Sequence, residues 1–107
     1  MKYCSVYVIA ADEAEAHKIG RMLVEEKLAG CANILPVKSI YHWKGGVEEA
    51  GEVAIFLKTR SSLADRVIER VKELHSYKVP CIVTLPIEKG NADYLKWIEE
   101  STESTKH

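Results

Sequence analysis

The chain has 107 residues, of which 47% are hydrophobic and 29% charged, a composition typical of one folded domain and not of a disordered or fibrous chain. Its formal net charge of -1 gives no overall field that would attract nucleic acid or a membrane surface, so neither is expected as a partner. The cysteines Cys4, Cys31 and Cys81 are widely spaced and form no CxxC pair, which argues against a disulfide framework and predicts a reducing, cytoplasmic setting.

The first predicted element is a buried central strand over residues 3–10, YCSVYVIA, which is rich in β-branched and aromatic residues. This apolar run is too short to span a membrane, and no signal-peptide cleavage pattern follows it. Asp12 and Glu15 then have capping-box spacing, which predicts the start of a helix. Gly30 is predicted to end that helix. Its helical spacing is carried by Ala16, Ile19, Met22 and Leu23.

A long hairpin is predicted next. Residues 31–43, CANILPVKSIYHW, form its first strand, in which Pro36 indicates an edge position or a bend because proline cannot donate to a sheet ladder. Gly45 and Gly46 give a hairpin turn signal, and residues 53–58, VAIFLK, lie on the returning strand. Arms of about 13 residues would be roughly 40 Å long, whereas a domain of this length has a radius of gyration of about 13 Å. We therefore expect the arms to overhang the body of the domain.

The rest of the chain predicts a helix, a strand and a short terminal helix. Ser62 with Asp65 is expected to start the helix, residues 81–85, CIVTL, form the last strand, and Asn91 caps the terminal helix. A polar tail is expected from about residue 101. The apolar stripe of the second helix consists of Leu63, Ala64, Val67, Ile68, Val71 and Leu74, and the terminal helix carries Tyr94, Leu95, Trp97 and Ile98.

The order β-α-β-β-α-β plus a helix predicts a ferredoxin-like α+β sandwich, in which helices cover one face of an antiparallel sheet. We expect a single domain over residues 1–107. An overhanging hairpin exposes strand edges and apolar side chains, and symmetric pairing with other copies would cover them. The pattern thus predicts an oligomer. The apolar residues on the hairpin are Ile40, Tyr41, Trp43, Val53, Ile55 and Phe56.

The chain lacks the motifs of RNA binding and of the common enzyme classes. The strand VAIFLK offers one aromatic residue, Phe56, and no glycine, whereas an RNA-recognition motif needs several of both. Tyr41, Trp43 and Lys44 near the hairpin tip are compatible with base stacking, but also with filling an interface. No GxSxG, GxGxxG or P-loop sequence occurs, so we expect no enzyme.

Cys31 and His75 are the candidate chemical residues. Both lie at predicted element boundaries, where loops bring side chains together, and cysteine and histidine suit soft metals. The same pair is compatible with a nucleophile and its base, and each residue also has a structural interpretation. A buried cysteine at a strand start is usually inert packing, and His75 could cap the second helix near its C-terminus, where a cation is favoured. His17, His42 and His107 have no zinc-finger spacing to any other ligand.

Four stretches of the chain carry a more specific signal. They are LVEEKLAGCANILP (23–36), SIYHWKGGVEEAGEVAIFLKT (39–59), HSYKVPCIVTLPI (75–87) and DYLKWI (93–98). Together, and in this order over nearly the whole chain, they resemble the CutA family of divalent-cation-tolerance proteins. The resemblance implies a ferredoxin-like subunit in a tight homotrimer similar to the P-II signalling proteins, with the long hairpins paired across subunits. It also implies a non-enzymatic role in the response to metal ions.

The resemblance further implies a metal site, with copper or another divalent cation as its ligand. Family proposals involve a cysteine in the first strand, a cysteine after the first helix and a histidine after the second helix. Cys31 and His75 match the second and third positions. The first falls near Val8, which cannot bind a metal, and Cys4 on the same face lies about 13 Å away along the strand. The three-ligand pattern is therefore incomplete in this chain.

A cleft between subunits is the second site that the resemblance implies. A carboxylate, a lysine and several polar aromatic side chains suit a small polar ligand, which would make the protein a P-II-like sensor of a metabolite. The same residues are compatible with a buried network that locks the trimer as a structural scaffold. The matching residues are Tyr41, Trp43, Glu52, Lys58, His75, Tyr77, Tyr94 and Trp97.

Overall fold

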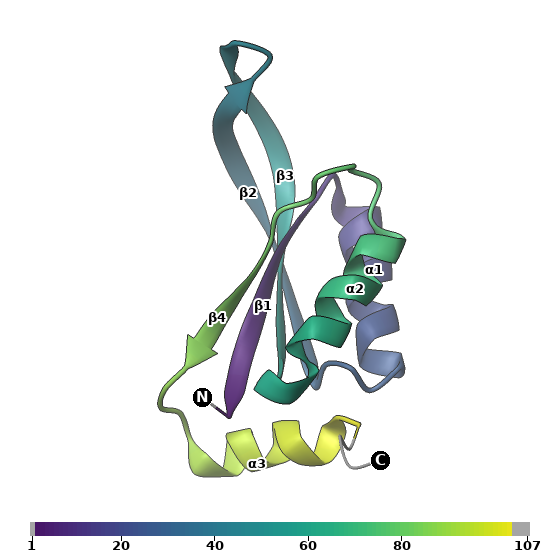
Figure 1. The fold of residues 1–107 in the computed structure, drawn as a ribbon, viewed down its shortest axis with the longest axis vertical. Helices are drawn as coiled ribbons and strands as arrows, with labels where there is room; N and C mark the ends of the chain where they lie inside the picture. The colour runs from purple at the N-terminus through teal and green to yellow at the C-terminus, as the bar shows by residue number, and fades with distance from the viewer. Residues whose placement is uncertain (1, 104–107) are drawn as a thin grey trace.

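The computed structural model describes residues 2–103, and its elements follow the predicted order (Figure 1). One antiparallel four-stranded sheet has the order β2-β3-β1-β4, so β1 is central and β2, which contains Pro36, is an edge strand, as predicted. This confirms the α+β, ferredoxin-like architecture. His107 and the predicted tail beyond Glu103 lie outside the described residues. The elements are β1 (Tyr3–Ala10), α1 (Glu13–Glu25), β2 (Cys31–Trp43), β3 (Gly46–Arg60), a 3-10 turn (Ser61–Leu63), α2 (Ala64–Leu74), β4 (Ile82–Ile87) and α3 (Ala92–Ser101).

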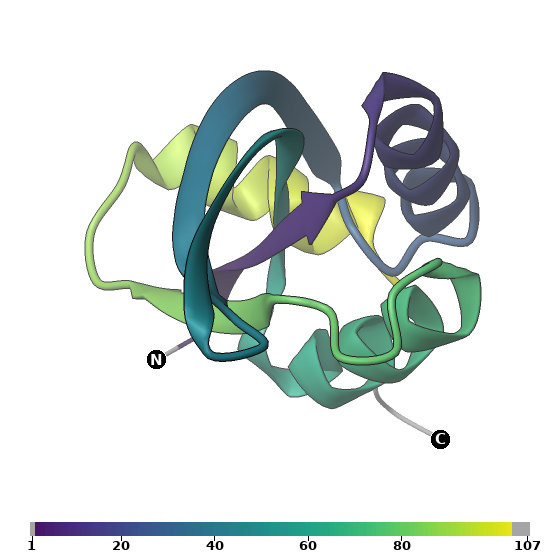
Figure 2. The ribbon, with the colours of Figure 1, turned by 90° about the horizontal axis from the view of Figure 1, so that it is seen from above.

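The core lies between the sheet and the helices α1 and α2, which Figure 2 shows on the same side of the sheet. Residues that lie directly opposite one another on neighbouring strands share a face, and alternate residues of one strand point to opposite faces. Val6 and Val8 of β1 therefore face the helices together with their partners Leu57 and Ile55 of β3, and all four are fully buried. From the helix side, the apolar stripe predicted for α2 supplies the buried Leu63, Val67 and Val71.

Neither α1 nor α2 covers the opposite face of the sheet, called here the uncovered face. It carries the other set of alternating positions, including Tyr7 of β1, Phe56 of β3 and Leu85 of β4. Leu85 and its neighbour Val83 are 43% and 46% exposed in the single chain, although both lie on a sheet surface. A sheet that leaves such side chains in water has a second face to bury.

Two helix boundaries differ from the sequence-based predictions. Helix α1 ends at Glu25, and Lys27 takes the left-handed conformation with φ of 61°, so the prediction that Gly30 ends the helix was wrong. Gly30 instead lies against α3, where a Cβ would stand 3.4 Å from the Cα of Ile98, an ordinary contact distance. Ser62 does not cap α2, which begins at Ala64 after the 3-10 turn and has no side-chain cap.

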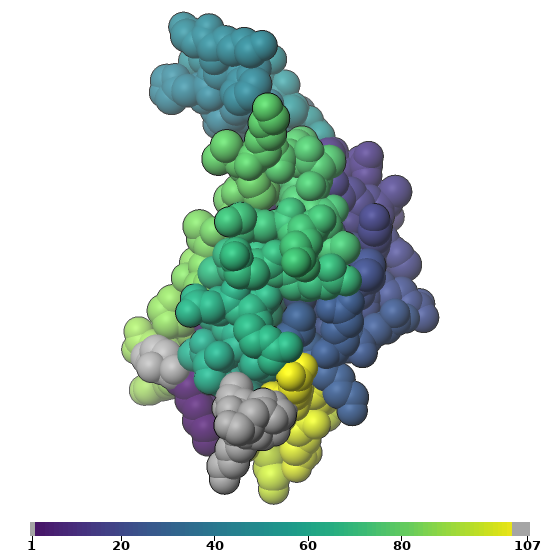
Figure 3. Space-filling model, turned by 45° about the vertical axis from the view of Figure 1, so that its right-hand side comes forward, coloured from purple at the N-terminus to yellow at the C-terminus, as the bar shows by residue number. Residues whose placement is uncertain are grey.

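The hairpin of β2 and β3 extends past the body of the domain, as predicted. Lys44 and Gly45, with φ of 47° and 78°, form its turn and Gly46 pairs with Trp43, so the turn lies one residue earlier than the Gly45-Gly46 signal suggested. The Lys44 ammonium lies 5.7 Å from the Trp43 ring. The molecule measures 45 × 26 × 21 Å, and Figure 3 shows the hairpin standing clear of the rest.

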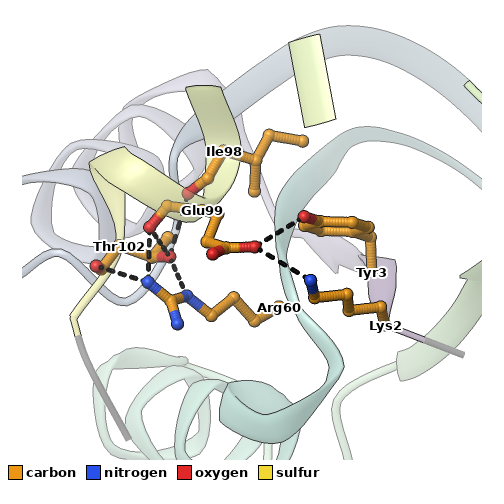
Figure 4. A network of polar contacts seen from close by, with 6 residues as sticks. All are labelled: Lys2, Tyr3, Arg60, Ile98, Glu99 and Thr102. Carbon is orange, nitrogen blue, oxygen red and sulfur yellow. Dashed lines mark hydrogen bonds and ion pairs between the residues drawn. The ribbon is translucent and has the colours of Figure 1, made fainter. Parts of the chain in front are cut away.

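Helix α3 is fixed across the lower end of the sheet by a polar network (Figure 4). Arg60 at the end of β3 donates from Nε to Thr102 Oγ1 at 2.9 Å and from Nη2 to the Glu99 carbonyl at 2.5 Å. The Glu99 carboxylate accepts from the Tyr3 hydroxyl at 2.8 Å and pairs with the Lys2 ammonium at 3.3 Å. Thr102 is only 6% exposed, so the chain is still anchored where the sequence analysis expected a polar tail.

Candidate functional site

The hairpin residues predicted for the cleft share one face of the sheet. Three pairs of residues lie directly opposite each other on β2 and β3: Cys31 with Lys58, Tyr41 with Glu48, and Trp43 with Gly46. Because side chains alternate along a strand, Cys31, Tyr41 and Trp43 of β2 and Glu52 and Lys58 of β3 all lie on the uncovered face. The strand period thus gathers five predicted site residues on the side of the sheet that α1 and α2 leave open.

An upper group forms where the hairpin leaves the body. The Tyr77 hydroxyl, in the loop after α2, donates to Glu52 Oε2 at 2.8 Å, and its ring centroid lies 5.0 Å from that of His75. Burial, followed by the bond to the Glu52 carboxylate, raises the pKa of Tyr77 to about 12, and Tyr41 adds to this shift. The Tyr77 phenol therefore remains a hydrogen-bond donor throughout the physiological pH range.

His75 is held inside the molecule by both of its ring nitrogens. Its side chain is fully buried, Nε2 lies 2.7 Å from the Ile9 carbonyl, and Nδ1 accepts from the Tyr77 amide at 3.1 Å. These partners assign the proton to Nε2. His75 is the C-cap residue of α2, the position that the sequence analysis considered, but its ring bonds to strand β1 and to its own loop and not to the last carbonyls of the helix. A metal ion on His75 would have to displace one of these two hydrogen bonds.

Glu15 supports the upper group and was predicted only as a helix cap. Its Oε1 accepts from the Ala11 amide at 2.9 Å, its Oε2 accepts from the Ser76 amide at 2.8 Å, and Oε1 lies 3.9 Å from His75 Nδ1. Burial alone would raise the pKa of Glu15, but the bonds from Ala11 and Ser76 outweigh it, so the pKa lies below its usual value. Glu15 therefore ties the start of α1 to the loop that carries Tyr77.

Replacing Glu15 by glutamine is expected to destabilise the protein by about 1–3 kcal/mol at pH 7, because an ionised acceptor of two amides is lost. A depressed carboxyl pKa contributes stability above the pKa of the unfolded chain and loses it as pH falls through the folded pKa. The difference between wild type and Glu15→Gln should therefore shrink below about pH 4.5. Urea unfolding from pH 7 to pH 3 measures it, with Glu13→Gln, an exposed residue of the same helical turn, as control. A constant difference across this range would contradict the assignment.

A lower group forms near α3. Lys58 Nζ donates to Asn33 Oδ1, which also lies 3.6 Å from Cys31 Sγ. Burial and then a hydrogen bond with Cys31 raise the pKa of Tyr94, and the Tyr94 and Trp97 rings stack at 5.7 Å. Sequence reasoning missed Asn33, although it lies two residues after Cys31 and therefore on the same face of β2.

The structure does not bring Cys31 and His75 together within one chain. Lys58 of β3 lies directly opposite Cys31 of β2 on one side and Ser5 of β1 on the other, so Cys31 is level with Ser5 across the sheet. The His75 ring instead bonds to the carbonyl of Ile9, which is four residues further along β1 than Ser5. Four residues of a strand span roughly 13 Å, whereas metal-ligand distances are about 2.0–2.3 Å. Within residues 2–103 there is no group of three or more His, Cys, Asp or Glu side chains that could hold a metal ion.

Cys4 cannot replace the cysteine that the family pattern has near Val8. Both Cys4 and Val8 lie on the helix-covered face and are buried, whereas Cys31 lies on the uncovered face. Burial also raises the pKa of the Cys4 thiol, which disfavours the thiolate that metals bind. Cys4 is a core residue.

Fold and site together define a ferredoxin-like α+β domain whose polar and aromatic residues gather on the sheet face opposite the helices. Residues 4–101 match the model of the family described as CutA1 divalent ion tolerance protein, and the chain belongs to that family. A divalent-cation tolerance protein CutA from Archaeoglobus fulgidus is 45% identical over 98 residues, which cover 92% of this chain and 96% of that one.

Solved structures agree with this assignment. That of the periplasmic divalent cation tolerance protein CutA from Archaeoglobus fulgidus superposes with a TM-score of 0.92 at 44% identity, over 94% of this chain and 99% of that one. CutA1 from Oryza sativa superposes with a TM-score of 0.94 at 38% identity, over 98% of this chain and 97% of that one.

The mouse protein CutA is 41% identical over 96% of this chain, which spans 59% of the mouse sequence. Among the described residues, no helix is long and apolar enough to cross a bilayer.

Proposed function

We propose that this chain works as a cytoplasmic, non-enzymatic homotrimer in the cell's tolerance of divalent metal ions. The names of its relatives support the role in tolerance. The observation that carries the assembly is the uncovered sheet face, which continues onto an overhanging hairpin where Tyr41 and Trp43 on the same face are 41% and 57% exposed. A closed ring of three P-II-like subunits would bury both surfaces. Light scattering tests it, with an expected mass of three times the 12.0 kDa of one chain.

Direct metal binding is proposed at Cys31 and His75, with copper or another divalent cation as the ion. A site that uses both residues takes them from two subunits, because one chain holds them roughly 13 Å apart along β1. The half-buried Cys31 thiol is the softer ligand and the better match to Cu(I).

Calorimetric titration with Cu(I), Cu(II) and Zn(II) measures this binding. Cys31→Ala is expected to lower the Cu(I) affinity by about tenfold or more, since a direct ligand is lost. Cys81→Ala, which removes the exposed cysteine, is the matched control. His75→Ala is measured beside its thermal stability, because the ring also holds β1 and the Tyr77 loop. Binding that is unchanged in both the Cys31 and the His75 variant would remove these residues from any metal site.

A second candidate function is a P-II-like sensor that binds a small metabolite between subunits. Its support is the group of polar side chains at the lower end of the uncovered face, which consists of the Lys58 ammonium, the Asn33 amide and the Tyr94 phenol. The competing role for these residues is a polar network that locks the trimer. A ligand-induced change in stability distinguishes the two, since a locked network gains nothing from a free metabolite.

A further inference from the structure

We propose that the lower group is a binding site for a small anion, whose carboxylate or phosphate oxygens are held by Lys58, Ser5 and Tyr94. This inference rests on the second function proposed above, because it names the ligand chemistry of the same cleft. It is independent of the metal site at Cys31 and His75, and its test can fail while the trimer and the metal response stand.

The first support is a row of side chains across three adjacent strands. Ser5 of β1 lies directly opposite Lys58 of β3, and Lys58 lies directly opposite Cys31 of β2. All three are on the uncovered face, and strands are about 4.8 Å apart, so the row spans roughly 10 Å. Tyr94 reaches Cys31 from α3, and Asn33 reaches Lys58 along β2.

The second support is the charge of Lys58. Its side chain is half-buried and its ammonium donates to Asn33 Oδ1, a neutral acceptor. Within residues 2–103 no carboxylate oxygen lies within 4.0 Å of this ammonium. An ammonium has three donors, and a charge that is partly removed from water is stabilised by a counter-ion. On the same strand, the Glu52 carboxylate is six residues away, which is roughly 20 Å.

The third support is the Ser5 hydroxyl. Ser5 is 7% exposed, and its Oγ is buried without a hydrogen-bond partner. Among the described residues, every other buried side-chain oxygen or nitrogen atom has such a partner. Such unpaired buried groups are rare in folded proteins and indicate a missing partner. Directly across from Lys58, the hydroxyl adds a neutral donor beside a positive charge. An anionic oxygen satisfies both groups at once.

The remaining groups of the site also favour an anion. Tyr94 of α3, next to Cys31, adds a phenol hydroxyl that can donate a hydrogen bond. The site therefore combines several hydrogen-bond donors with one positive charge, and in the described part of the chain no carboxylate oxygen lies within 4.0 Å of the Lys58 ammonium.

Calorimetry on the full chain tests the proposal, with EDTA present so that metal ions do not contribute. The probes are inorganic phosphate and succinate, and the probe that binds more tightly identifies which anion chemistry the site prefers. Lys58→Met is expected to weaken binding by about tenfold or more, and Ser5→Ala by about threefold or more. Lys18→Met, which removes an exposed lysine on α1 at the other side of the sheet, should bind like wild type.

Several results would overturn the proposal. An anion site here is excluded if the wild-type protein binds neither probe. It is also excluded if Lys58→Met or Ser5→Ala binds the probes as tightly as wild type does. If Lys58→Met dissociates the oligomer in light scattering while wild type binds neither probe, the ammonium pairs with a carboxylate of a second copy. None of these outcomes bears on the proposed trimer or on the proposed metal response. The trimer is tested by the mass of the wild-type oligomer, and the metal response by the separate metal titration.

Discussion

Leu85→Asp is expected to convert the proposed trimer into single chains. Leu85 is 43% exposed in the isolated chain and lies on the uncovered face, so the single chain tolerates a carboxylate there. In a ring that buries this face, each subunit would place one unpaired carboxylate in an apolar interface. The cost of burying such a charge is several kcal/mol, and a symmetric trimer repeats it at three interfaces.

Light scattering at micromolar concentration measures the change, from three times 12.0 kDa toward 12.0 kDa. Circular dichroism of the variant should keep the wild-type content of helix and strand, because the core lies on the other face of the sheet. Ala14→Asp makes the same type of substitution at an exposed position of α1 and should leave the mass unchanged. A Leu85→Asp variant with the wild-type mass would show that this face is not the contact.

The element order and the overhanging hairpin were predictable because their signals are local. The continuous apolar run of β1 and the helical stripe of α2 record which surfaces these elements bury, and burial selects apolar residues directly. The length of the two hairpin arms then fixes the overhang. Errors fell where backbone conformation depends on a single residue. Lys27 and Lys44 adopt left-handed φ angles that glycine usually takes, so neighbouring glycines gave a misleading position for the helix end and the turn.

The candidate site was predictable only in part. Residues on one hairpin share a face through the strand period, which is why Cys31, Glu52 and Lys58 fall together. The separation of Cys31 from His75 depends on the register of β1 against β3 and on the docking of the α2–β4 loop, and no sequence spacing records either. Ser5 shows the same limit, since a serine in an apolar strand gives no sign that its hydroxyl lacks a partner.

Arg60→Met is expected to destabilise the fold by about 2–3 kcal/mol by loosening α3. The last carbonyls of a helix have no partner within the helix and lie at the negative end of its dipole. Arg60 donates to the Glu99 carbonyl at 2.5 Å and to Thr102 Oγ1 at 2.9 Å, so its guanidinium satisfies groups at this end. Hydrogen bonds from a charged donor contribute about 1.5–3 kcal/mol each, and methionine keeps only the apolar part of the side chain.

Arg66 provides the matched control, because it also reaches the chain beyond α3. Its guanidinium pairs with Glu103 at 2.7 Å, but the arginine side chain is 54% exposed, and an ion pair of this kind contributes at most about 1 kcal/mol. Urea unfolding at a fixed chain concentration compares Arg60→Met with Arg66→Met, followed by circular dichroism and by tryptophan fluorescence, to which Trp97 on α3 and Trp43 on the hairpin both contribute. Equal losses in the two variants would mean that burial of the Arg60 contacts adds nothing, and that α3 is held by its apolar contacts with Gly30 and the sheet alone.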